Sequence, residues 1–160
     1  YCLRASLQAL KGKTLNAPSW WQLTQINYAR LEGFEHLQAS LAHTRPGLGI
    51  AWLAEHSSSI GIDVERSSRT INAKGSHHFL QNGEALEGRS LLEMWSLKEA
   101  CFKAAVPTLG NKEGRGDWVL KDFRLHEDQT FSYQGRSLGF WAQERKRFGG
   151  EEFLLSFAWH

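Results

Sequence analysis

Residues 60–65 read Ile60-Gly61-Ile62-Asp63-Val64-Glu65, a short run in which branched apolar side chains alternate with other types. Successive side chains of a β-strand point to opposite faces, so the alternation predicts a strand over 59–65. Ile60, Ile62 and Val64 would pack into the core, while Gly61, Asp63 and Glu65 would share the other face. Since glycine leaves that face bare, we expect a ligand to approach the backbone there.

The two carboxylates on this face, Asp63 and Glu65, repel each other unless a cation or basic groups lie between them. A hard divalent ion such as Mg²⁺ takes oxygen ligands of this kind, and substrate phosphates can complete its coordination. Two solvent-facing acidic residues at the end of an edge strand would give the same pattern. The strand alone therefore leaves a metal site and an ordinary acidic surface open.

A second stretch, residues 95–103, reads Trp95-Ser96-Leu97-Lys98-Glu99-Ala100-Cys101-Phe102-Lys103 and has helical periodicity. Ser90 and Glu93 have the spacing of a capping box, which predicts a helix under way by residue 91. We expect the helix to end before Pro107.

Glu99 and Lys103 lie four residues apart and are therefore neighbours on one face of this helix. An exposed ion pair would explain them and would contribute only about 0.3–0.5 kcal/mol. The flanking Trp95 and Phe102 favour a partly covered surface instead, because large apolar groups are rarely left in open solvent.

The rest of the chain supplies further strands and few helices. Residues 37–43, 48–54 and 59–65 are separated by short polar turns and predict a small antiparallel meander. Later strands are expected at 118–125, 130–133, 138–144 and 153–159, with a loop at 111–116 and the bases 145–147 in another loop. A short helix is expected at 4–10 and a linker at 66–76, and residues 20–34 show no clear period. The predicted fold class is α+β.

Composition limits the functional classes. The chain has 160 residues, 41% apolar and 22% charged, enough for one domain or two small lobes. A formal charge of +2 gives no reason to expect a nucleic-acid partner. No apolar run reaches the roughly 20 residues that span a bilayer. Cys2 and Cys101 fit free thiols in a reducing compartment, so a cytoplasmic protein is expected; the opening at Tyr1 leaves the completeness of the N-terminus open.

Together, the two stretches resemble the signature pair of the phosphopantetheinyl transferase superfamily. That family has a strand reading G-(I/V)-D-x-E and, some tens of residues later, a helix reading W-S-x-K-E-x-x-x-K. Order, spacing and every diagnostic residue agree. His43, 20 positions before Asp63, is similar to the histidine of an S-H-S element in surfactin-type members, although its neighbours Ala42 and Thr44 depart from the serines. Glu65 makes the chain resemble this two-lobed, usually monomeric type.

The resemblance implies two pseudo-symmetric lobes, 1–66 and 67–160, with the active site in the cleft between them. It also implies transfer of the phosphopantetheine arm of coenzyme A to a serine of an acyl- or peptidyl-carrier protein. Asp63, Glu65 and Glu99 would converge on one Mg²⁺, and Glu99 would accept the serine proton. Coenzyme A phosphates would meet His43, Lys98, Lys103 and Arg4, although most of the upstream basic residues of surfactin-type enzymes are absent.

Two other functions remain open at this stage. One is a different Mg²⁺-dependent phosphoryl-transfer enzyme, which would use the three carboxylates but would not explain the W-S-x-K-E context. The other is a degenerate family member that binds coenzyme A or a carrier protein without turnover. The sequence does not indicate which carrier protein or pathway is served.

Overall fold

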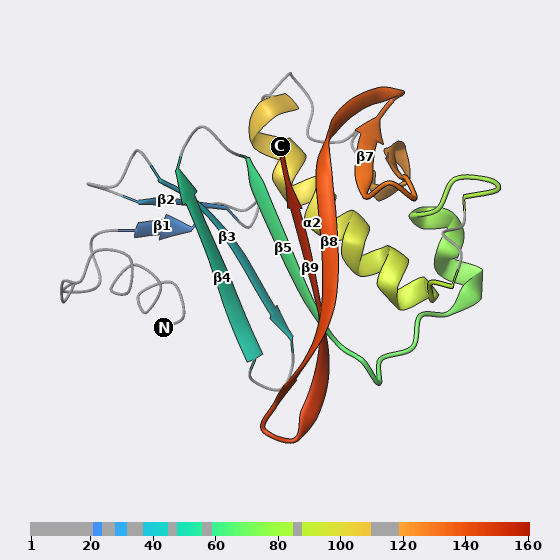
Figure 1. Cartoon of the computed structure of the whole chain (residues 1–160), viewed down its shortest axis with the longest axis horizontal. Helices are drawn as coiled ribbons and strands as arrows, with labels where there is room; N and C mark the ends of the chain where they lie inside the picture. Colours follow the sequence, from blue (N-terminus) through green and yellow to red (C-terminus); the bar gives the residue numbers. More distant parts are fainter. Residues whose placement is uncertain are drawn as a thin grey trace.

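The architecture comes from a computed structural model that describes residues 21–23, 28–31, 37–44, 48–55, 59–84, 88–109 and 119–160. Two antiparallel sheets and one long helix dominate these residues, which confirms the α+β class (Figure 1). Three predicted features lie outside them: the helix at 4–10, the loop at 111–116 and Cys2. The division into lobes at residue 66 stays a prediction.

The first sheet has the strand order β1-β2-β3-β4. Its strands are β1 (Trp21–Leu23), β2 (Tyr28–Leu31), β3 (Leu37–Thr44) and β4 (Leu48–Glu55). The predicted strands at 37–43 and 48–54 are confirmed as a hairpin, paired from Leu37 opposite Glu55 to Thr44 opposite Leu48. The segment without a clear period contributes the two short strands, β1 and β2.

The second sheet has the order β5-β9-β8-β7-β6. These strands are β5 (Ile60–Arg66), β6 (Phe123–Leu125), β7 (Thr130–Tyr133), β8 (Arg136–Phe148) and β9 (Glu151–Trp159). The start of the strand expected at 118–125 is instead a 3₁₀ turn, η2 (Leu120–Asp122).

The basic run at 145–147 is also not a loop, because β8 continues through it to Phe148. Arg147 lies opposite Glu152 on β9, and the Arg145 side chain forms an ion pair with the same Glu152 at 3.0 Å. Opposite charges on facing strands favour pairing, which explains why this basic run extends the strand rather than ending it.

The predicted meander of three strands is wrong at its third member. β5 does not continue the first sheet; it pairs with β9, from Ile60 opposite Trp159 to Arg66 opposite Phe153. Residues 60–65 are buried on both faces, so the strand needs a covering layer on each side. It lies between helix α2 on one side and the first sheet on the other, and Ser40 of β3 accepts a hydrogen bond from the Ile62 amide at 3.0 Å.

Helix α2 (Leu91–Leu109) begins where the capping box predicts. The Ser90 amide donates to the Glu93 carboxylate at 2.7 Å, and the Glu93 amide donates to the Ser90 hydroxyl at 3.3 Å. The helix extends two residues beyond Pro107, past the expected end. The linker contains a short 3₁₀ helix, η1 (Ala73–His78). Among the described residues, no helix is long and apolar enough to cross a membrane.

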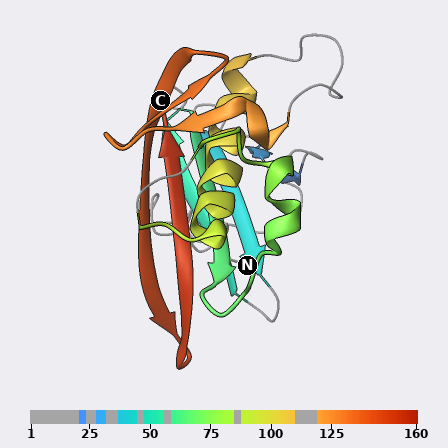
Figure 2. The same ribbon diagram turned by 90° about the vertical axis from the view of Figure 1, so that its right-hand side faces the viewer.

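Two apolar clusters lie on the two faces of the second sheet. The larger one joins α2 to the strands and includes Leu97, Cys101, Phe123, Phe131 and Trp141. The smaller one lies between the sheets and contains Ala42, Ile62, Val64, Phe153 and Leu155. The edge-on view in Figure 2 shows α2 against one face of the β8 and β9 strands. The helix face of β5 therefore opens onto α2, where the acidic residues lie.

Candidate active site

Gly61 brings β5 and α2 into close contact. A Cβ atom at this position would collide with the Ala100 carbonyl oxygen and the Ala104 amide nitrogen. The expectation that Gly61 leaves room for a ligand is therefore wrong, because the helix backbone takes that space. The glycine instead lets α2 approach closely enough for its side chains to reach the carboxylates that follow on β5.

Asp63 is buried, with 8% of its surface exposed, and is bonded to α2 at both carboxylate oxygens. The Ser96 hydroxyl donates to Oδ2 at 2.8 Å, and the Lys103 ammonium lies 3.2 Å from Oδ1. Lys103 also donates to the Ile62 carbonyl oxygen at 3.0 Å. The strand and the helix thus fix this carboxylate from two directions. The alternative that Asp63 is a solvent-facing acidic residue of an edge strand is excluded.

Glu65 and Glu99 complete an acidic group around these contacts. Glu65 is buried and forms an ion pair with Arg69, four residues further along the chain. Glu99 is partly buried, and burial raises the pKa of its carboxyl group; the Lys103 and Arg69 cations lower it, while the Asp63 and Glu65 carboxylates raise it. The net effect is a raised pKa of Glu99. The side chain interacts electrostatically with all four charged neighbours.

The charges of this group do not balance. Three carboxylates (Asp63, Glu65, Glu99) face two cations (Lys103, Arg69), which leaves one negative charge in excess within a partly buried volume. Burying such an excess is costly unless a further cation is bound or a proton is taken up.

The expected convergence of the three carboxyl groups on one metal-sized space is not seen. In the part of the chain that the structure describes, no three His, Cys, Asp or Glu side chains are grouped as metal ligands. Arg69 and Lys103 instead take up two of the carboxylates. The donor chemistry still fits Mg²⁺, which prefers carboxylate oxygen and commonly uses one or two carboxylates together with water and phosphate.

A family model described as the 4′-phosphopantetheinyl transferase superfamily matches residues 59–158, from the start of β5 to the end of β9. The match covers more than half of the chain and includes both signature stretches. The chain belongs to the 4′-phosphopantetheinyl transferase superfamily. Members of this superfamily transfer phosphopantetheine, with coenzyme A and carrier proteins as their general partners. No curated protein matches the chain.

The lysine of the superfamily's W-S-x-K-E helix, Lys98, has a different position from the one expected. It is fully buried and bonds to Glu84 and to the Phe123 carbonyl oxygen, both at 2.5 Å. Burial lowers the pKa of the ammonium, and Glu84 only partly opposes this shift. Because both contacts are internal, we correct its assignment from a phosphate contact to a structural ion pair.

The two remaining candidate contacts to coenzyme A are not tested. His43 is exposed near the end of β3, opposite Gly49 of β4. Arg4 lies outside the described residues. Their proposed contacts to phosphates of coenzyme A stay predictions.

Sequence reasoning missed three residues of this superfamily member's site. Ser96 belongs to the helix motif, but the motif does not indicate its bond to Asp63. Arg69 follows Glu65 by four residues, a spacing that is compatible with their ion pair. The Ser156 hydroxyl lies 2.8 Å from the Ser96 hydroxyl. Ser156 belongs to the run Phe153–Trp159, in which all the remaining residues are apolar. A lone polar residue in a buried strand is the signal that could have found it.

Proposed function

We propose that this protein is a Mg²⁺-dependent 4′-phosphopantetheinyl transferase of the two-lobed surfactin type. It would move the phosphopantetheine of coenzyme A to a serine of an acyl- or peptidyl-carrier protein, as a cytoplasmic monomer. The observation that carries the proposal is the ion pair of Lys103 on α2 with Asp63 on β5, together with the electrostatic interaction of Glu99 with Asp63 and Glu65. Glu65 supports the surfactin type, since small trimeric holo-acyl-carrier synthases typically lack it.

The metal ligands would be Asp63, Glu65 and Glu99. When bound, Mg²⁺ would supply the positive charge that offsets the negative charge developing on the leaving group. The excess negative charge of the site supports this assignment, because a divalent cation would offset it. Arg69 would have to leave Glu65 for this carboxylate to become a ligand.

The reaction would begin with attack of the serine hydroxyl oxygen on the β-phosphorus of coenzyme A. A new phosphorus–oxygen bond forms while the bond to the bridging oxygen breaks, and 3′,5′-ADP leaves. Glu99 would accept the hydroxyl proton, directly or through water, as a carboxylate next to Lys103 and Asp63. Lys103 would donate to a phosphate oxygen, since catalysis of such transfers is mostly positioning and charge neutralisation.

One observation favours a second candidate, a family member that binds coenzyme A without turnover. The burial of Lys98 removes one of the few basic residues available for the phosphates. A different Mg²⁺-dependent phosphoryl-transfer enzyme would use the same carboxylates. It would differ from the proposed transferase in its substrate.

The test is incubation of the protein with coenzyme A, Mg²⁺ and an apo-carrier protein, followed by mass spectrometry of the carrier. The proposal predicts a gain of one phosphopantetheine that is lost in Asp63→Ala and kept in Glu127→Ala, a control that removes an exposed acidic residue. Coenzyme A binding without mass gain on any carrier would favour the non-catalytic member. Absence of both would favour the other phosphoryl-transfer enzyme.

A further inference from the structure

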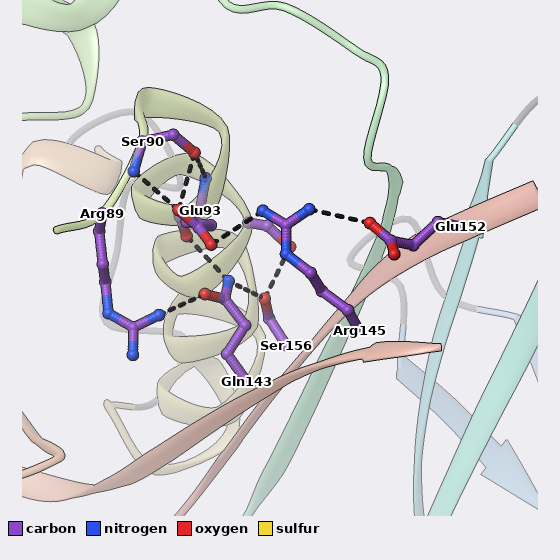
Figure 3. Close-up of polar contacts among 8 residues, drawn as sticks. Arg89, Ser90, Glu93, Gln143, Arg145, Glu152 and Ser156 are labelled. Carbon is purple, nitrogen blue, oxygen red and sulfur yellow. Dashed lines mark hydrogen bonds and ion pairs between the residues drawn. The ribbon is translucent and has the colours of Figure 1, made fainter. Parts of the chain in front are cut away.

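A row of three polar residues crosses the second sheet beneath α2. Asp63 of β5 is the cross-strand partner of Ser156 on β9, and Ser156 is the partner of Gln143 on β8. Figure 3 shows Gln143 and Ser156 pointing toward the N-terminal half of α2. Buried polar side chains are retained where their hydrogen bonds are satisfied, so the contacts of this row are informative.

The contacts form one continuous series of hydrogen bonds. Arg89 lies 2.5 Å from Gln143 Oε1, and Gln143 Nε2 lies 2.8 Å from the Ser156 hydroxyl. The Ser156 and Ser96 hydroxyls are 2.8 Å apart, and Ser96 donates to Asp63 Oδ2 at 2.8 Å. Both serines are fully buried.

The direction of the donors in this series follows from its two ends, the Arg89 guanidinium and the Asp63 carboxylate. A guanidinium only donates, so Arg89 requires the oxygen of the Gln143 amide to face it. Gln143 Nε2 then donates both protons, one to Ser156 and one to the Glu93 carbonyl oxygen at 3.1 Å. Ser156 accepts the bond from Gln143. Because the Ser96 hydroxyl donates its one proton to Asp63, Ser96 accepts from Ser156 in turn. The guanidinium of Arg89 also lies over the Trp141 ring, 4.7 Å from its centroid, which holds it in place.

We propose that Gln143 and Ser156 are positioning residues that act through Ser96 to hold the Asp63 carboxylate in the orientation of a metal ligand. The inference rests on the proposed function, in which Asp63 binds Mg²⁺. One oxygen of Asp63 is saturated by Ser96, so the other remains directed at Lys103 and the acidic group. Removing a residue that orients a ligating carboxylate typically weakens metal affinity about 10–100-fold.

The experiment measures Mn²⁺ affinity by electron paramagnetic resonance of free Mn²⁺, without coenzyme A or carrier. Ser156→Ala should weaken Mn²⁺ binding about 10-fold, and Gln143→Met, which cannot donate, should weaken it less. Ser156→Thr keeps the hydroxyl and should recover most of the affinity even where its extra methyl lowers stability. The matched control is Ser132→Ala, a buried serine of β7 that bonds to His126 and lies outside the series.

The outcomes separate the inference from the function on which it rests. Unchanged Mn²⁺ affinity in Asp63→Ala would overturn the proposed metal site. Loss of binding in Asp63→Ala with unchanged affinity in both Ser156→Ala and Gln143→Met would overturn only the positioning role. An equal loss in Ser132→Ala would also overturn it, because general loosening would then explain the effect. If Ser156→Ala does not fold, the partly exposed Gln143→Met decides the question.

Discussion

Helix α2 buries two lysines, and their surroundings differ in charge balance. Lys98 meets one carboxylate, Glu84, which also accepts from the Leu125 amide at 3.2 Å and the Gln81 amide at 2.9 Å. Lys103 lies 3.2 Å from Asp63, in a group that also holds Glu65, Glu99 and Arg69.

The first pair is neutral and fully satisfied, whereas the second group retains an excess negative charge. A neutral, satisfied pair connects secondary structures and offers nothing to a ligand. An unbalanced group is unstable until a cation or a proton arrives, which is the condition expected of a binding site. Two lysines five residues apart on one helix thus serve different purposes, and only their partners distinguish them.

The largest expected effect is on stability, from Lys98→Met. Removing this ammonium leaves Glu84 buried without its ion-pair partner, which should lower the free energy of unfolding by about 3–5 kcal/mol. Lys103→Met should cost less than half as much, because Ser96 still donates to Asp63. Chemical denaturation of both variants measures the difference. Added Mn²⁺ should raise the melting temperature of Lys103→Met more than that of Lys98→Met, because only the loss of Lys103 increases the excess negative charge of the acidic group; equal responses would contradict the distinction.

Gly61→Ala should produce the next largest effect, confined to the Lys103 side of the helix. The added methyl group would push α2 away from β5, with an overpacking cost of about 1–3 kcal/mol. The wider separation should also weaken Mn²⁺ binding. Gly75→Ala is the control, since a Cβ there meets no atom. Unaltered Mn²⁺ affinity in Gly61→Ala would show that the close approach does not set the site geometry.

Glu99→Gln should stabilise the protein at neutral pH. The folded state raises the pKa of Glu99 above its ordinary value of 4.5, so its protonation favours folding below that value, and this contribution is lost as pH rises through the folded pKa. Glutamine does not titrate. The gain should therefore be greatest near pH 7, a few degrees of melting temperature for about 1 kcal/mol, and should disappear below about pH 4.5. Thermal melts from pH 4 to 8 measure it; a gain independent of pH would contradict the charge argument.

The smallest effect is expected for Arg69→Gln. Its ion pair with Glu65 is nearly half exposed and should contribute little to stability. Because Arg69 would compete with the proposed metal for the Glu65 carboxylate, its removal should tighten Mn²⁺ binding a few-fold in the same electron paramagnetic resonance assay. Arg124→Gln, on an exposed position of β6, is the control. Weaker binding in Arg69→Gln would mean that the arginine supports the site rather than competing for it.

The sequence predicted those features that are encoded locally. The alternation of residues 60–65 and the spacing of Ser90 and Glu93 each lie within one element, and the strand and the helix start follow from them. Partner choice is different, because it depends on residues far along the chain. Gly61 was misinterpreted because the backbone of α2 fills its space, and Lys98 because Glu84 and Phe123 lie beside it only in the folded protein. Which cation meets which carboxylate is set by the packing of segments that are distant in the sequence.

The pairing of β5 with β9 also has a consequence for the order of folding. Ser156 and Ser96 are 60 residues apart, and the bond that joins them to Asp63 closes only after the last strand has been synthesised. A nascent chain that ends before β9 therefore lacks the strand that joins β5 to the rest of its sheet, and contacts of such long sequence separation slow folding. The bond from Ser156 to Ser96, and with it the support of the Asp63 carboxylate from β9, would therefore form late in synthesis.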